Sequence, residues 1–143
     1  MEINSTLYDA VGNIGILMVD HRETVHVRRA MVEASEHGDS QPLRDYMNSC
    51  ILAARKGAVM VSPFISPQER DVLTVLLKEE HPIILLADNG FGEYYKPSNL
   101  LFDAVAEGKL LIICPWKYDP KKKHITRNEC ITLNDLAAAI AAR

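Results

Sequence analysis

The segment DNGFGEYYKPSN, residues 88 to 99, follows a run of apolar residues and contains the residue types that shape ligand pockets. Gly90 and Gly92 allow positive φ angles and a close approach of the backbone to a ligand, while Asn89 can turn the chain through its side chain. Ser98 precedes an amphipathic stretch, where it would open a helix whose free amides attract an anion. The segment therefore predicts the wall of a pocket; the alternative is a long connection with two glycines for tight bends.

A second segment, WKYDPKKKHITR at residues 116 to 127, contains five lysine or arginine residues against one aspartate. Aromatic rings can stack on bases while ammonium groups meet phosphates, so this segment is a candidate for binding a single-stranded nucleic acid. The alternative is a solvated lysine loop whose tryptophan packs inward. The candidate residues of this segment are Trp116, Lys117, Lys121, Lys122 and Lys123.

Arg127 is the strongest anion-binding candidate among these cations. It stands in the first turn of a predicted helix, where the helix dipole disfavours a positive charge. Its planar guanidinium can bind a phosphate or a carboxylate through two hydrogen bonds. A cation at this position therefore indicates an anion nearby.

The elements that must position these residues alternate along the chain. Four short, nearly continuous apolar runs are typical of strands covered on both faces. They lie at residues 14–19, 58–62, 83–87 and 110–114. The alternation with helices predicts one three-layer α/β domain of the Rossmann-like type over residues 1–143, with a mainly parallel sheet of four or more strands flanked by helices.

The predicted helices have recognisable starts. Ser66 with Glu69, and Thr126 with Glu129, form capping-box patterns before amphipathic stretches. The segment from about residue 24 to 56 is predicted as two helices on either side of the polar break HGDSQP. The segment after residue 126 is therefore expected to be helical and to present Arg127 at its first turn.

In open parallel sheets, ligands bind beyond the carboxyl ends of the strands, near the point where the strand order reverses. We expect four connections to meet at this edge, at residues 20–23, 62–67, 88–99 and 115–126. The predicted pocket for a nucleotide or phosphate consists of Arg22, Ser62, Asn89, Gly90, Gly92, Ser98, Arg127 and Asn128.

Composition limits the classes of partner. The chain has 143 residues, 48% hydrophobic and 24% charged, with a net charge of −3, so it has a globular composition and no overall basic field for nucleic acid. The three cysteines, Cys50, Cys114 and Cys130, are widely spaced and favour reduced thiols over a disulfide framework. No apolar run approaches the roughly 18 residues of a membrane helix, so we expect a soluble, cytoplasmic protein without a membrane partner.

Residues 57 to 134 resemble the Rossmann-like domain of the DNA-processing protein A (DprA/Smf) family, part of the wider SLOG/LOG-like superfamily. The shared features, in order, are Asn89-Gly90, Tyr95-Lys96-Pro97 with Asn99, and Arg127-Asn128 after a basic, proline-containing loop. The resemblance implies a Rossmann-like fold that binds a nucleotide or a single-stranded nucleic acid.

Compared with the family pattern that it resembles, the chain is divergent and shortened. Ser62 is the only match to the family's Ser-Gly-x-Arg-Gly loop, because Pro63 and Ser66 replace its glycines. Arg22 corresponds to a family arginine but lacks the glycine that precedes it. The family's strand after the Arg-Asn helix has no counterpart in these 143 residues.

Sequence motifs for catalysis are weak. The chain has no Gly-x-Ser-x-Gly elbow, Walker A loop or complete Gly-x-Gly-x-x-Gly, and its histidines lack zinc-type spacing, so no catalytic residue, metal or cofactor is predicted. The favoured hypothesis is a non-catalytic binding module. The alternatives are a nucleotide- or sugar-phosphate-processing enzyme of the same superfamily, with Glu69 or Asp71 as acid or base, and a degenerate domain kept for homodimer formation through an exposed helix.

Overall fold

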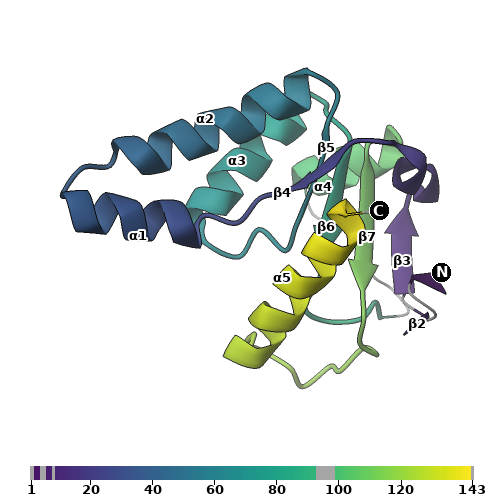
Figure 1. Cartoon of the computed structure of the whole chain (residues 1–143). Helices are drawn as coiled ribbons and strands as arrows, with labels where there is room; N and C mark the ends of the chain where they lie inside the picture. The colour runs from purple at the N-terminus through teal and green to yellow at the C-terminus, as the bar shows by residue number, and fades with distance from the viewer. Residues whose placement is uncertain (1, 4–5, 8, 93–98, 143) are drawn as a thin grey trace.

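The computed structural model describes residues 2–3, 6–7, 9–92 and 99–142, and its central feature is a five-stranded sheet of order β3-β7-β6-β5-β4 (Figure 1). The strands of this sheet are β3 (Asp9–Gly12), β4 (Arg22–Thr24), β5 (Val59–Ser62), β6 (Ile83–Leu86) and β7 (Leu110–Cys114). A separate antiparallel pair is formed by β1 (Glu2–Ile3) and β2 (Thr6–Leu7). The helices are η1 (Ile14–Met18), α1 (Arg28–His37), α2 (Gln41–Arg55), α3 (Pro67–Lys78), α4 (Asn99–Ala106) and α5 (Arg127–Ala141).

The sheet is parallel from β4 to β7, and only β3 runs antiparallel to its neighbour β7. Every residue of β5 and β7 is buried, which explains why these strands are continuous apolar runs instead of alternating ones. The prediction of a three-layer α/β fold with a mainly parallel sheet is confirmed.

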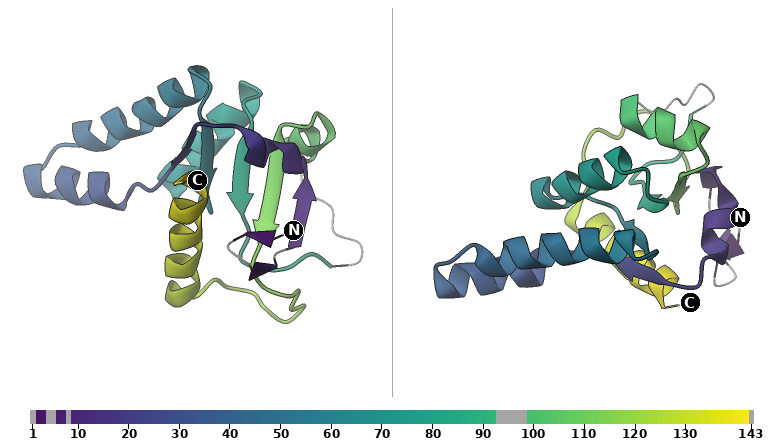
Figure 2. Two further views of the ribbon diagram at one scale, coloured as in Figure 1. Left: turned by 45° about the vertical axis from the view of Figure 1, so that its right-hand side comes forward. Right: turned by 90° about the horizontal axis from the view of Figure 1, so that it is seen from above.

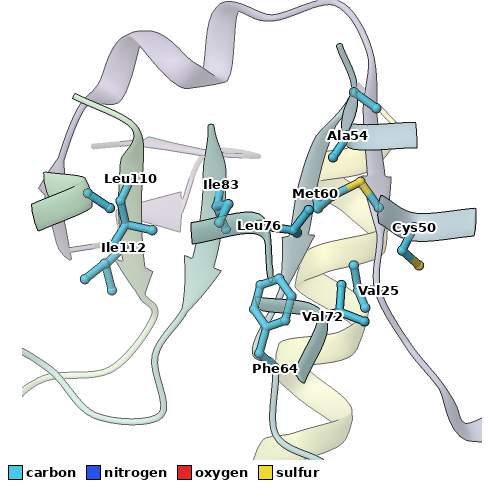
Figure 3. Close-up of a cluster of buried hydrophobic side chains, with 12 residues drawn as sticks. Val25, Cys50, Ala54, Met60, Phe64, Val72, Leu76, Ile83, Leu110 and Ile112 are labelled. Atoms are coloured by element: carbon cyan, nitrogen blue, oxygen red, sulfur yellow. The ribbon is translucent and has the colours of Figure 1, made fainter. Parts of the chain in front are cut away.

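Helices cover both faces of the sheet (Figure 2). On one face, α2, α3 and α4 pack against a cluster of strand side chains that includes Met60, Ile83 and Leu110 (Figure 3). On the other face, α5 and η1 pack against the alternate strand residues, among them Val61 and Ile113. The three β-α-β connections that end in β5, β6 and β7 each advance one strand, so their helices share one face.

The prediction of a strand at residues 14–19 was wrong, because this segment forms the 3-10 helix η1 (Ile14–Met18). The Asn13 side chain accepts a hydrogen bond from the Gly15 amide and turns the chain out of the sheet. The strand beside β5 at this edge of the sheet is instead the short polar segment β4, whose residues are only half buried. Because an edge strand is covered on one side only, its sequence lacks the apolar run that identifies the inner strands.

The two helix starts with capping boxes were predicted correctly, whereas the helix expected from about residue 24 begins at Arg28, because residues 22–24 form β4. Capping boxes are present at Ser66 with Glu69 and at Thr126 with Glu129, and the break between α1 and α2 falls at residues 38–40. The three cysteines are free thiols. In the described part of the chain, no helix combines the length and the apolar composition needed to cross a membrane.

The turn after β3 requires glycine at position 12. Gly12 has a φ of 108°, a region that favours glycine, and a Cβ atom there would collide with the backbone of Leu110 in β7. The next residue, Asn13, donates from its backbone amide to the Leu110 carbonyl at 3.0 Å, so the two strands are close at this point.

We expect Gly12→Ala to destabilise the fold by about 1–3 kcal/mol more than Gly57→Ala. Gly57 is a matched control because it has a similar φ of 103° but open space around a Cβ atom. Urea unfolding monitored by circular dichroism measures both free energies. Equal losses would contradict the steric role assigned to the contact between β3 and β7.

Candidate ligand groove

A groove of about 560 Å³ is lined by residues of α1 and α5 and of the segments that follow β4 and β5. Figure 1 shows the positions of these helices and strands. Residues on α1 and α5 recur at intervals of three and four, which places them on the helix faces that line the groove. The groove is lined by His26, Val27, Arg28, Met31, Val32, Ser35, Ile65, Ser66, Glu69, Arg127, Cys130, Ile131, Asn134 and Asp135.

The walls of the groove are apolar and largely uncovered. Met31 and Val32 of α1 are 40% and 47% exposed, and Ile131 of α5 is 48% exposed. Val27 and Ile65 contribute further apolar surface at the base. Apolar surface concentrated in a concave site is typical of a binding surface, whereas single exposed apolar residues need no explanation.

The buried carboxylate of Glu69 forms the floor of the groove. Its Oε2 accepts a hydrogen bond from the Val27 amide at 3.0 Å, and its Oε1 accepts from the amides of Ile65 and Ser66 at 3.1 and 3.2 Å. Tyr46 holds the same segment from the α2 side, because its hydroxyl accepts from the His26 amide at 2.9 Å. Burial raises the pKa of Tyr46, so its phenol stays protonated. The backbone around the groove is therefore fixed before any ligand binds.

Two arginines line the groove, each as the first residue of its helix. Arg28 begins α1 and Arg127 begins α5, and neither guanidinium has a hydrogen-bond or ion-pair partner among the described residues. The first turn of α1 contains no acidic residue, and no side chain caps it. The amino ends of two helices and two arginines make this end of the sheet attractive to an anion, although Asp135 also contributes a carboxylate to the wall.

Of the predicted pocket residues that the structure describes, Arg127 alone lines this groove. Asn128 follows it on the exposed surface of α5, and its carbonyl accepts a hydrogen bond from the Thr132 hydroxyl at 3.0 Å. Arg22 lies at the other end of the sheet, because it pairs in register with Val59, the first residue of β5. Its guanidinium donates to the Leu17 carbonyl at 2.8 Å. The structure therefore does not place Arg22 beside Arg127.

Ser62 lies at the carboxyl end of β5 but is fully buried. Its hydroxyl donates to the Val25 carbonyl at 2.7 Å and accepts from the Phe64 amide at 2.9 Å. These bonds tie the end of β5 to the residue that follows β4. Ser62 thus supports the base of the groove without lining it.

The predicted pocket residues at 89–92 are used in a contact between two loops. The Asn89 side chain donates to the Asp119 carbonyl and accepts from the Asp119 amide, both at 2.9 Å. Gly90 is buried, and a Cβ atom there would overlap the backbone of residues 116–118, while Gly92 faces the ring of Tyr118. The close backbone approach that these glycines allow is to another part of the same chain. Ser98 lies outside the described residues.

In the lysine-rich segment at residues 116–127, one lysine makes contacts within the protein. Lys122 donates from its ammonium group to the Asp88 carbonyl and to the Glu129 carboxylate, and it lies 5.0 Å from the centroid of the Trp116 ring. Trp116 is half buried and packs against the core beneath α5. The exposed cations of this loop are Lys117, Lys121 and Lys123.

A smaller recess of about 380 Å³ lies at the ends of β5 and β6, and it shares Ile65 with the groove. Its lining is mostly apolar, with Arg70 and Asp88 as its charged residues. Arg70 donates to the Ile65 carbonyl at 2.7 Å and so supports the ridge between the two recesses. Within the described residues, no group of three histidine, cysteine, aspartate or glutamate side chains could hold a metal ion.

Searches of protein-family models, of curated proteins and of solved structures find no match to this chain. The resemblance to the DNA-processing protein A family therefore stays a prediction. The groove, the helix ends around it and its two arginines are the observations from which a function can be argued.

The side of the groove formed by α1 was missed by sequence reasoning. Arg28, Met31, Val32 and Ser35 recur with helical spacing, but such a stripe predicts only that one helix face is distinct. Which face a neighbouring helix leaves open depends on tertiary packing. The helical spacing alone therefore could not show that these α1 residues line a groove.

The loop contact gives a stability prediction. We expect Gly90→Ala to cost about 1–3 kcal/mol, because the new methyl group meets backbone atoms that cannot move aside separately. Gly92→Ala is the matched control and should cost less, since its nearest atoms belong to the Tyr118 ring at 3.3 Å, which can rotate. Thermal and urea unfolding of both variants test this. A smaller loss for Gly90→Ala than for Gly92→Ala would contradict it.

The pH dependence of Glu129 gives a second prediction. Hydrogen bonds from Lys122 and from the Thr126 amide lower the pKa of Glu129 below its ordinary value of 4.5. A carboxyl group with a lowered folded-state pKa stabilises the fold above its unfolded pKa, and this contribution disappears as the pH falls through the folded-state pKa.

Glu129→Gln should therefore reduce stability near neutral pH, and the difference from the wild type should shrink below about pH 4. Glutamine can still accept the Thr126 amide, so the comparison isolates the charge. Urea midpoints across a pH series provide the measurement, with Glu107→Gln, at the exposed turn after α4, as control. A difference that is constant with pH would show that the carboxylate charge is not involved.

Proposed function

We propose that this protein is a non-catalytic binding module that holds a nucleotide in the groove between α1 and α5. The observation that best supports this is Arg127, a cation at the first turn of a helix with no hydrogen-bond or ion-pair partner in the part of the chain that the structure describes, on the wall of a groove of about 560 Å³ at the carboxyl edge of the sheet. Sites for small ligands commonly have volumes of about 300–1,000 Å³ and mostly apolar linings with a few polar groups.

The arginines of the groove suit the phosphate of a nucleotide, and its apolar side chains suit the base. A guanidinium can bind a phosphate with two parallel hydrogen bonds, which are stronger when donor and acceptor are both charged. The apolar side chains Met31, Val32 and Ile131 can cover the faces of a base. The resemblance to the DNA-processing protein A family, argued from the sequence, favours the same class of ligand.

A single-stranded nucleic acid is the less favoured ligand. Lys117, Lys121 and Lys123 are exposed and could meet phosphates. Trp116, however, already contacts the Lys122 ammonium and the core, so its ring is not a free platform for stacking. The geometry thus favours a mononucleotide over a strand.

The enzymatic alternative gains no specific support from the groove. Glu69, the carboxylate at its floor, already accepts hydrogen bonds from three backbone amides. Asp71, the other candidate acid or base, is exposed on α3 and is not among the residues that line the groove. We therefore propose binding without catalysis.

A homodimer is the second part of this proposal. The exposed apolar residues of α1 favour a second copy as the partner of this helix. Most soluble oligomers are symmetric assemblies of one chain, which makes a twofold dimer the simplest case.

The test of the proposed function is a thermal-shift screen with nucleoside mono-, di- and triphosphates, followed by calorimetric titration. A ligand at a hundred times its dissociation constant adds about 2.7 kcal/mol to the free energy of unfolding. Arg127→Ala should then weaken binding roughly 10- to 100-fold, the loss expected for a charged hydrogen-bond donor, with little change in stability.

Arg29→Ala is the matched control for Arg127→Ala. It removes the same charge from a neighbouring helix start, but Arg29 does not line the groove and contacts Glu33 at 3.6 Å. Equal weakening in both variants would indicate a general charge effect and would contradict the groove as the binding site. The absence of any stabilising nucleotide in the screen would contradict the proposed function itself.

A further inference from the structure

The helices α1 and α2 form an arm that projects from the body of the molecule (Figures 1 and 2). Of the ten residues of α1, only Ala30 is buried, although the helix contacts α2. The arm therefore presents a helix face that the described residues of this chain leave uncovered.

The uncovered face of α1 has an apolar centre and charged ends. Arg28, Val32 and Glu36 follow one another at intervals of four residues, so they lie along one side of the helix. Val32 is 47% exposed, and Met31 beside it is 40% exposed. Neither Arg28 nor Glu36 has a hydrogen-bond or ion-pair partner among the described residues.

The charges of α1 are arranged against its own dipole. Arg28 and Arg29 stand at the amino end, where a helix favours acidic residues, and Glu33 and Glu36 stand toward the carboxyl end, where it favours basic ones. With respect to the dipole this arrangement is unfavourable, and within α1 only Arg29 and Glu33 among these described residues form an ion pair, at 3.6 Å. The arrangement is complementary, however, to a second copy of the same helix that runs in the opposite direction.

We propose that α1 pairs antiparallel with α1 of a second copy, around a twofold axis that passes beside Val32. This inference rests on the homodimer proposed for this protein and specifies its interface. A twofold axis at Val32 places Arg28 opposite Glu36 of the partner subunit and Glu36 opposite the partner's Arg28. The pairing covers the exposed side chains of Val32 and Met31 in both copies and gives both unpaired charges a partner.

The test uses charge reversals in the full-length chain. Arg28→Glu alone places two carboxylates together at each end of the helix pair, and Glu36→Arg alone places two guanidinium groups together. Each single variant should weaken the dimer roughly tenfold or more, because like charges at an interface are strongly unfavourable. The double variant R28E/E36R restores opposite charges and should return the dimerisation constant to within about threefold of the wild type.

Sedimentation over a concentration series measures these constants, against a chain mass of 16.0 kDa. Circular dichroism of each variant checks that α1 remains folded, and Lys78→Ala, on the exposed surface of α3 and outside the groove, serves as a control that should leave the dimer unchanged. A wild type that is monomeric throughout would overturn both the homodimer and this interface. A dimer that is unaffected by the single reversals, or not rescued in the double variant, would overturn the interface alone and leave the homodimer standing.

Discussion

The groove depends on one buried charge, the carboxylate of Glu69. Transfer of a carboxylate from water into a protein is costly unless hydrogen bonds replace its hydration, and three backbone amides do so here. Two of these amides, at Ile65 and Ser66, belong to the turn before α3. The third, at Val27, lies 42 residues away, at the start of α1. One side chain therefore sets both the capping of α3 and the direction in which the arm leaves the sheet. The opening between α1 and α5 follows from that direction.

The inner part of the fold could be predicted from the sequence because its signals are local. A strand buried on both faces must be apolar throughout, and a capping box needs only two residues three positions apart, so β5, β6, β7, α3 and α5 were found. The edges of the sheet could not be predicted in this way. The strand β4 is polar because its outer side has no neighbouring strand, and the apolar segment at 14–18 is a helix because Asn13 turns the chain before it. In both places the residue types depend on whether another element packs against the segment, and this is known only from the folded chain.

The same limit applies to the site. A glycine that lets a ligand approach the backbone and a glycine that lets another loop approach it have identical local signatures, so Gly90 was expected in a pocket but lies against residues 116–118. Arg127 was identified because its position conflicts with the helix dipole, an energetic signal that needs no knowledge of the fold. Arg28 has the same conflict at the start of α1. The dipole criterion could not select Arg28 from the sequence, because no side chain caps α1 and the helix was expected from about residue 24, whereas it begins at Arg28.

The two proposals for α1 are energetically coupled. Met31 and Val32 form a wall of the groove and are also the apolar centre of the proposed helix pair, so a nucleotide and a second copy would cover the same side chains. When two partners require one surface, each must weaken the binding of the other by the same factor. Arg28 would then exchange a carboxylate of the second copy for a phosphate of the ligand, whereas Arg127, on α5, would be available in both states. The charges of α1 that oppose its dipole would thus bind either a phosphate or the charges of a second copy. The arm would then be the element through which nucleotide binding and dimer formation affect each other.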